Sequence, residues 1–405
     1  MQSSVKLLIA QACERSGYYL VIDMIGTYAA ERLGWQPHEA MLLGGLLGGT
    51  AYVGPIFGGA IADKVIGCGA ALLAGCTALL VGYTSLAAGA PIALVALLMA
   101  IGNGLYKPSA TATCGKLAAR GQRQDAMYKF YMAINIGAIA APIIGETMHV
   151  LLGWSAAFYT AAGLLCVTMA IVRSRSVQAA ANGLIAYLPT TGPEQRRLYA
   201  PERTLYWLYG IVTVFWTGFN QFNGTLTFWA RDWTDRHLLW FTIPPTVFAA
   251  LNSMYIIVFG ARPALWFERR GLSFRFQLEI GMVIMAFSYV LMMLAAIFST
   301  QGHASMLWLV AAYGAMSLSE ILISPAMLTL IAEAVPSGRT AMHMGLWFGT
   351  SAVGHYAAGA IGYATGALGY AWVFSGLAAM MLFGAAGMRR LSSGIKEVSC
   401  RVASE

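Results

Sequence analysis

The sequence predicts an all-α polytopic membrane protein with twelve transmembrane helices in two six-helix halves. Of its 405 residues, 58% are hydrophobic and 10% are charged, whereas soluble domains carry about 25% charged residues. So few charges cannot cover a surface that faces water, which argues against a soluble enzyme. The apolar residues also occur in runs of roughly 20, the length needed to cross a bilayer.

Twelve such runs follow one another along the chain. They cover residues 5–31, 38–62, 69–89, 91–115, 125–149, 153–173, 203–229, 241–267, 275–298, 305–334, 341–366 and 369–388. The longest polar stretch separates the sixth run from the seventh and contains Pro193 and Pro201. It is too polar and too interrupted to hold a further span.

These runs define four parts of the chain. We expect an N-terminal six-helix half at 1–173, a cytoplasmic linker at 174–202, a C-terminal six-helix half at 203–390 and a cytoplasmic tail at 391–405.

Basic residues collect in alternate loops. If both termini are cytoplasmic, nineteen of the 25 Lys and Arg residues lie in cytoplasmic loops and only Arg32, Arg231 and Arg236 lie in the opposite ones. Cytoplasmic loops carry the excess of Lys and Arg. We therefore expect both termini in the cytoplasm, and the net charge of +8 reflects topology rather than binding of nucleic acid.

No pattern typical of a catalytic or metal site is present. The six cysteines are scattered without a CxxC pair, and neither HExxH nor GxSxG occurs. For His355, in the eleventh run, packing is the favoured interpretation and a position facing a cavity is the alternative. We predict no enzyme activity, no metal and no cofactor.

Five ionisable side chains lie well inside the predicted spans: Glu14, Arg15, Asp23, Lys107 and Glu320. A charge at the bilayer centre costs at least about 2.5–3.5 kcal/mol, so charges retained there mark functional sites. Three acids against two bases indicate partners around one shared polar cavity. The structural alternative is an ion pair from Glu14 or Asp23 to Lys107 that ties the first helix to the fourth.

The layout of two six-helix halves joined by a linker resembles the major facilitator superfamily, whose halves rock around a site at mid-membrane. The segment GGAIADKVIG at 58–67 resembles the superfamily's loop motif, which implies a gating role for Asp63 and its neighbour Lys64. Glycines at 44, 45, 48 and 49 have the GxxxG spacing that lets two helices pack closely.

Seven ordered segments resemble signature segments of the proton-coupled oligopeptide transporter family. They are QACERSGYY (11–19), GNGLYKPSATATCGKL (102–117), FYMAINIGAIAAP (130–142), FWTGFNQ (215–221), IPPTVFAALNSMYII (243–257), SEILISPAMLTLI (319–331) and MGLWFGTSAVGHY (344–356). The first matches the family's ExxERFxYY motif at Glu14, Arg15, Tyr18 and Tyr19. The resemblance extends over nearly the whole chain.

This resemblance implies the roles of individual residues. Arg15 and Lys107 would receive the carboxylate of a peptide, and Glu320 would receive its amino terminus. The implied lining of the pocket is Tyr18, Tyr19, Tyr52, Asn135, Asn220, Gln221, Asn252 and Trp347. For Tyr52 and Trp347, core packing is the alternative.

Two carboxylates of the family pattern are replaced by amides, which cannot titrate. Gln11 stands at the first glutamate of ExxER and Asn220 at the glutamate before Gln221. The remaining candidates for proton coupling are Glu14 and Asp23, acting through Lys107. Asp23 has no counterpart in the motif, and it would either repel ordinary dipeptides or attract a cationic group.

We therefore predict a secondary active transporter in the cytoplasmic (inner or plasma) membrane that moves di- and tripeptides or peptide-like molecules by alternating access. It is expected to be proton-coupled, with a reduced set of coupling carboxylates, and to be a monomer in the lipid bilayer. The alternatives are a facilitator or exporter of a modified peptide, metabolite or drug, and a membrane sensor that does not transport.

Overall fold

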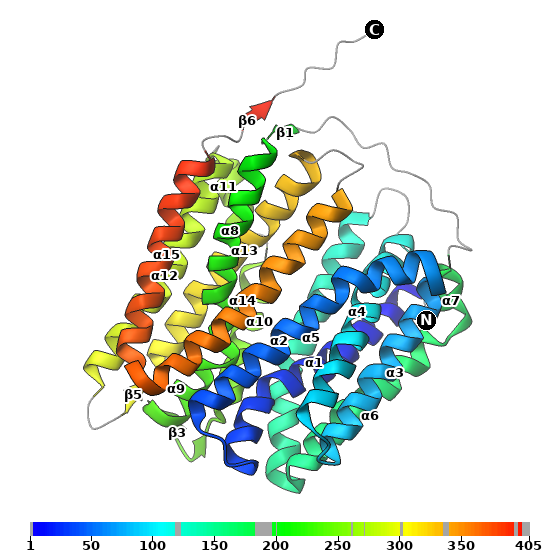
Figure 1. Cartoon of the computed structure of the whole chain (residues 1–405), viewed down its shortest axis with the longest axis horizontal. Helices are drawn as coiled ribbons and strands as arrows, with labels where there is room; N and C mark the ends of the chain where they lie inside the picture. The colour runs from blue at the N-terminus through cyan, green and yellow to red at the C-terminus, as the bar shows by residue number, and fades with distance from the viewer. Residues whose placement is uncertain are drawn as a thin grey trace.

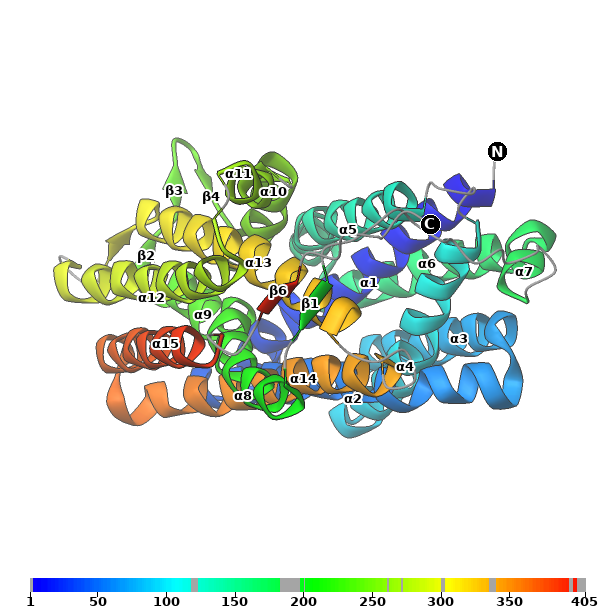
Figure 2. The ribbon, with the colours of Figure 1, turned by 90° about the horizontal axis from the view of Figure 1, so that it is seen from above.

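The computed structural model describes residues 3–117, 123–182, 197–199, 201–260, 262–270, 272–299, 303–334, 340–392 and 396–398. Long helices in two groups make up the molecule. The helices of the first half, blue to green, lie on one side, and those of the second half, green to red, lie on the other (Figures 1 and 2).

The first half consists of six long helices, one for each of the first six predicted runs. They are α1 (Ser3–Arg32), α2 (Pro37–Ile61), α3 (Cys68–Ala87), α4 (Ile92–Leu117), α5 (Arg123–Leu152) and α6 (Trp154–Val172). A short π-helix, η1 (Ala62–Ile66), extends α2. The apolar runs thus become helices because an apolar segment can satisfy its backbone polar groups internally only in this way within a membrane.

The second half contains four continuous long helices and two interrupted ones. The continuous helices are α12 (Phe274–Phe298), α13 (Leu307–Ala334), α14 (Thr340–Leu368) and α15 (Tyr370–Ser392). The seventh run is divided into α8 (Glu202–Phe219), the 3-10 turn η2 (Asn220–Asn223) and α9 (Thr225–Trp233). The eighth is divided into η3 (Pro245–Ala249), α10 (Ala250–Phe259) and α11 (Arg262–Arg269).

Both interruptions have a local cause. Gly224 takes φ −129° and ψ −93° between η2 and α9, a backbone conformation that no regular helix contains. Pro244 and Pro245 stand where η3 begins, and Gly260 takes φ 54° and ψ −140° after α10, a conformation that ends the helix before α11. Broken helices at membrane depth are tolerated where they line a cavity. The first break brings Asn220 to such a position.

Within the described residues, eight helices are long and apolar enough to cross a membrane. The helices α1 and α14 have the length but a more polar sequence, and the interrupted helices are shorter. The all-α membrane fold expected from composition is confirmed.

Each half has its own apolar core. One cluster of buried side chains includes Leu20, Tyr83 and Phe158 of the first half. The other includes Tyr289 and Phe374 of the second half. Because the two cores are separate, each half can move as a unit, and the interface between them is free to hold polar groups.

The closest contact between the halves runs along α2 and α14, which lie beside each other in both views (Figures 1 and 2). A Cβ on Gly45 would lie 2.5 Å from the Cα of Gly359, and one on Gly48 would collide with the ring of His355. The packing role expected from the GxxxG spacing is confirmed.

The linker carries one element that its polar sequence did not predict. Helix α7 (Arg175–Ala181) packs against α3 and α4 of the first half. Gln178 Nε2 donates to the carbonyl of Gly69 in α3 at 3.3 Å, and Lys116 Nζ of α4 donates to the carbonyl of Ala181 at 2.8 Å. Further on, β1 (Arg197–Tyr199) pairs antiparallel with β6 (Lys396–Val398) of the tail. Most of the linker and tail lies outside the described residues.

Four further strands are two residues long and lie at the opposite end of the second half (Figure 1). β2 (Thr234–Asp235) pairs parallel with β5 (Ala304–Ser305), and β3 (His237–Leu238) pairs antiparallel with β4 (Phe241–Thr242).

Candidate functional site

A polar cavity of about 100 Å³ lies between the two halves. Its lining includes Tyr18, Tyr19, Asp23, Tyr52, Tyr131 and Asn135 of the first half, and Trp216, Asn220, Asn223, Asn252, Glu320 and His355 of the second. Ligand pockets measure about 300–1,000 Å³. A molecule of the size of a dipeptide therefore enters only when the halves move apart.

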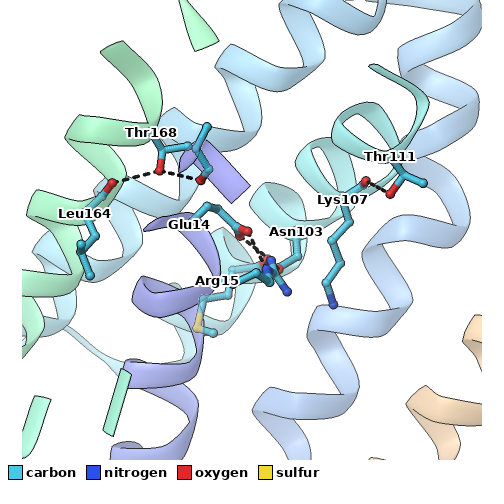
Figure 3. A network of polar contacts seen from close by, with 9 residues as sticks. Glu14, Arg15, Asn103, Lys107, Thr111, Leu164 and Thr168 are labelled. Carbon is cyan, nitrogen blue, oxygen red and sulfur yellow. Dashed lines mark hydrogen bonds and ion pairs between the residues drawn. The ribbon is translucent and has the colours of Figure 1, made fainter. Parts of the chain in front are cut away.

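Glu14 and Arg15 form a buried ion pair on α1, with side-chain exposures of 0% and 3%. Arg15 Nε donates to Glu14 Oε2 at 2.5 Å, and Arg15 Nη2 contacts Glu14 Oε1 and donates to Asn103 Oδ1 at 3.0 Å (Figure 3). The charge of Arg15 is thus already compensated. Neither residue lines the cavity, although the guanidinium lies 4.6 Å from the ring centroid of Tyr18, which does.

Lys107 of α4 has no such partner among the described residues. Its Nζ lies 3.8 Å from the ring centroid of Tyr52 and 5.2 Å from that of Tyr18. Figure 3 shows its side chain extending beside Arg15, with no dashed line to its amino group. The structural alternative, an ion pair from Glu14 or Asp23 to Lys107, does not occur in the described part of the chain, where Glu14 binds Arg15 and the Oδ1 of Asp23 has no partner.

Glu320 of α13 lies on the opposite wall of the cavity. Asn252 Nδ2 of α10 donates to Glu320 Oε2 at 3.2 Å and to Ser317 Oγ at 3.1 Å. The described residues contain no ion pair to Glu320. Glu320 thus lines the cavity from the second half, and Lys107 of the first half lies against Tyr18 and Tyr52, which line it too.

Asp23 lies on α1 beyond Arg15, and its residue is 4% exposed. Its Oδ1 atom is buried without a hydrogen-bond partner among the described residues. Eight residues of helix separate it from Arg15, about 12 Å along the axis at 1.5 Å per residue. The cavity lining thus contains a second acid besides Glu320.

The break between α8 and α9 forms the third wall. Asn220 Nδ2 lies 2.8 Å from His355 Nδ1, and the His355 ring stacks on Tyr52 with centroids 4.9 Å apart. The favoured interpretation for His355 is packing, and the alternative is a position facing a cavity. The structure shows both, because the ring packs on Tyr52 and also lines the cavity. Gln221 turns away from the cavity and donates to the carbonyls of Thr217 and Ala358.

The remaining expected pocket residues differ in position. Asn135 is buried, lines the cavity and donates to the carbonyl of Tyr131 at 2.9 Å. Trp347 is 6% exposed, and its ring centroid lies 5.7 Å from that of Trp216, which lines the cavity. Trp347 therefore lies behind the cavity wall. Tyr131 and Trp216 line the cavity although the sequence did not single them out. Both belong to segments of the family signature, which is the signal that points to them.

The gating role expected for Asp63 and Lys64 stays a prediction. Asp63 and Lys64 have backbone positions in η1, where Lys64 is exposed and the side chain of Asp63 lies outside the described part of the chain. No cluster of three His, Cys, Asp or Glu side chains that could hold a metal ion occurs among the described residues.

The halves meet at the end of the bundle where α1 ends and α2 begins. Thr246 of η3 donates a hydrogen bond to Glu146 of α5. A Cβ on Gly366 of α14 would lie 2.9 Å from the ring of His38, at the start of α2. These contacts close the cavity at this end.

Comparisons with known proteins agree with this architecture. A model of the Major Facilitator Superfamily matches residues 7–275, and a model of the POT family matches residues 203–367. Dipeptide and tripeptide permease A of Pectobacterium carotovorum is 27% identical over 409 residues, covering 86% of this chain and 80% of the permease. The permease of the same name from Chromobacterium violaceum is 28% identical, with coverages of 85% and 81%.

Solved structures of the same type share the fold. A peptide transporter POT in complex with sulfate superposes with a TM-score of 0.85 at 19% identity, over 97% of this chain and 96% of the other. A POT family transporter in complex with 5-aminolevulinic acid gives 0.84 at 17% identity, with coverages of 95% and 94%.

Proposed function

Because this chain belongs to the major facilitator superfamily and, within it, to the POT family, we propose that it carries di- and tripeptides or peptide-like small molecules across a membrane by alternating access. The observation that carries this proposal is the cavity between the halves, with Lys107 beside one wall and Glu320 in the other. The family expected from the seven segments is confirmed, and its members are transporters rather than enzymes.

A peptide is a zwitterion, and its two ends match the two walls. Lys107 attracts the carboxylate as a point charge, since its amino group lies over aromatic rings and has no counter-ion among the residues that the structure describes. Glu320, positioned by Asn252, accepts hydrogen bonds from the amino terminus. Tyr18, Tyr19 and the amide of Asn135 line the space between and suit varied side chains.

Proton coupling rests on the ion pair of α1. Arg15 can turn to a substrate carboxylate only if Glu14 releases it, and a proton on Glu14 removes the charge that holds the pair together. Gln11 and Asn220 carry no titratable proton. We therefore assign the coupling carboxylate to Glu14, with Arg15 and Lys107 as the groups that sense the substrate.

The contacts between the halves support an orientation. Basic residues favour cytoplasmic termini, which makes the closed end, with its Glu146 to Thr246 contact, the extracellular one. Transport then requires α2 and α14 to separate at the extracellular end while the cytoplasmic ends of the two halves approach each other. Asp63 and Lys64 lie in η1, at the cytoplasmic end of α2, where the halves would then meet. The bacterial relatives favour the cytoplasmic membrane. A monomer in the bilayer suffices, because one chain encloses the cavity.

Counterflow of labelled Ala-Ala in proteoliposomes tests this function, followed by uptake with and without an imposed pH gradient. Wild type should exchange the peptide, whereas Glu320→Gln and Lys107→Ala should each lose most of the exchange. Glu279→Gln is the matched control, since that carboxylate lies on α12 and pairs with Arg389 outside the cavity. Full exchange by both cavity variants would refute the two-ended site.

A further inference from the structure

The cavity contains one charge that the proposed peptide site does not use. The carboxylate of Asp23 lines the cavity, and its residue is 96% buried. No hydrogen bond or ion pair reaches it within the described residues, and its Oδ1 is buried without a partner. A buried carboxyl group without a partner either takes up a proton or is compensated by a group that enters the cavity.

A second orphaned oxygen lies in the same cavity. Asn223, the last residue of η2, lines the cavity, and its side-chain Oδ1 is buried without a hydrogen-bond donor among the described residues. The hydroxyl of Tyr313 donates to the carbonyl of the preceding residue, Phe222, at 3.1 Å and so holds this turn against α13. Two unpartnered acceptors in the lining of one cavity suit a group with several hydrogen-bond donors, such as an ammonium or a guanidinium.

The acidic groups of the cavity lining lead to the same conclusion. Glu14 and Arg15 neutralise each other and do not line the cavity. Asp23 and Glu320 are the acidic side chains of the lining, and the proposed site uses Glu320 for the amino terminus of the peptide. Asp23 is therefore left for a further cationic group.

We propose that Asp23, together with Asn223, is a subsite for a second cationic group of the substrate, so that the transporter prefers peptides with a lysine or arginine side chain. This inference rests on the proposed function, since it requires the peptide ends to lie at Lys107 and Glu320. Tyr18, which lies over Lys107, is five residues from Asp23 on α1, about 7.5 Å along the axis. A long basic side chain spans that interval and a short one does not.

Competition against uptake of labelled Ala-Ala tests the subsite. The competitors are Ala-Lys and Ala-Lys acetylated on its side-chain amine, which has nearly the same shape but no side-chain charge. In wild type, Ala-Lys should compete about tenfold better, the ratio that a single charge-assisted contact provides. In Asp23→Asn this ratio should fall to about one while uptake of Ala-Ala persists.

Three further variants complete the test. Asp23→Glu keeps the charge and should retain part of the preference, and Asn223→Ala should reduce it. Glu279→Gln removes a carboxylate outside the cavity and should leave the ratio unchanged. Thermal unfolding of each purified variant shows that the fold is intact.

Two results would overturn the subsite. One is equal competition by the two peptides in wild type. The other is a uniform loss of uptake for all peptides in Asp23→Asn, which would make Asp23 a proton carrier instead. If wild type exchanges no peptide at all, the proposed function fails rather than the subsite.

Discussion

Removing the charge of Glu14 should destabilise the protein far more than removing any exposed carboxylate. Arg15 is 3% exposed, and Glu14 supplies its only counter-charge within the described residues. In Glu14→Gln the guanidinium keeps its contact to Asn103 but loses that counter-charge. Loss of one partner from a buried pair costs about 3–5 kcal/mol, because the other charge remains buried and uncompensated.

The control for this prediction is the pair of Glu279 and Arg389. Its atoms are 3.9 Å apart, and the side chains are 27% and 78% exposed. Exposed pairs contribute about 0–1 kcal/mol. Glu279→Gln should therefore change stability by less than about 1 kcal/mol.

Thermal unfolding of the detergent-purified variants measures the difference in stability. The midpoint temperature of Glu14→Gln should lie clearly below the midpoint temperatures of wild type and Glu279→Gln. The double variant Glu14→Gln with Arg15→Met should recover part of the loss, because it removes the uncompensated charge as well. A Glu14→Gln protein as stable as Glu279→Gln would show that the charge of Arg15 is solvated or otherwise compensated. The argument for Glu14 as the coupling carboxylate would then fail.

Three other predictions concern the interface and the cavity. Gly45→Leu should abolish exchange, because any side chain there meets the backbone of the facing helix at 2.5 Å, whereas Gly163→Ala, with nothing within 4 Å, should leave it intact; uptake assays of both variants check this, and active Gly45→Leu would contradict the close packing. Glu320→Gln should weaken binding of Ala-Ala about 10-fold to 100-fold, since charge-assisted contacts contribute about 1.5–3 kcal/mol. The same substitution should leave the affinity for an N-acetylated peptide unchanged, and calorimetry measures both affinities. His355→Ala should weaken peptide binding by about tenfold through loss of its contacts to Asn220 and Tyr52; unchanged affinity would reduce His355 to packing.

Much of the fold could be predicted from the sequence because crossing a membrane is a local property. An apolar run of roughly 20 residues becomes a helix whatever its neighbours are. The twelve runs accordingly correspond to the helices of the structure, and the glycines at 45 and 48 lie where α2 packs on α14. The breaks at Gly224 and Gly260 have local causes too, but both glycines lie inside apolar runs and hydropathy alone does not distinguish them.

The candidate site was only partly predictable. The sequence identifies which charges are buried, and Asp23, Glu320 and Asn252 do line one cavity. It also suggested Trp347, which the structure places behind Trp216. The sequence alone does not distinguish a core position from a pocket position for Trp347, because aromatic residues are common in both.

The sequence by itself determined the class of the protein, its helices and the short set of charges that a membrane must accommodate. Only the tertiary structure decided the partners of those charges. Arg15 is held by its neighbour Glu14, whereas in the described part of the chain Lys107 has no counter-ion and the Oδ1 of Asp23 has no donor. The physical reason is that the cost of burying a charge depends on its own position along a helix. Its compensation depends on the distance and direction of groups on other helices, which arise only when the two halves pack together.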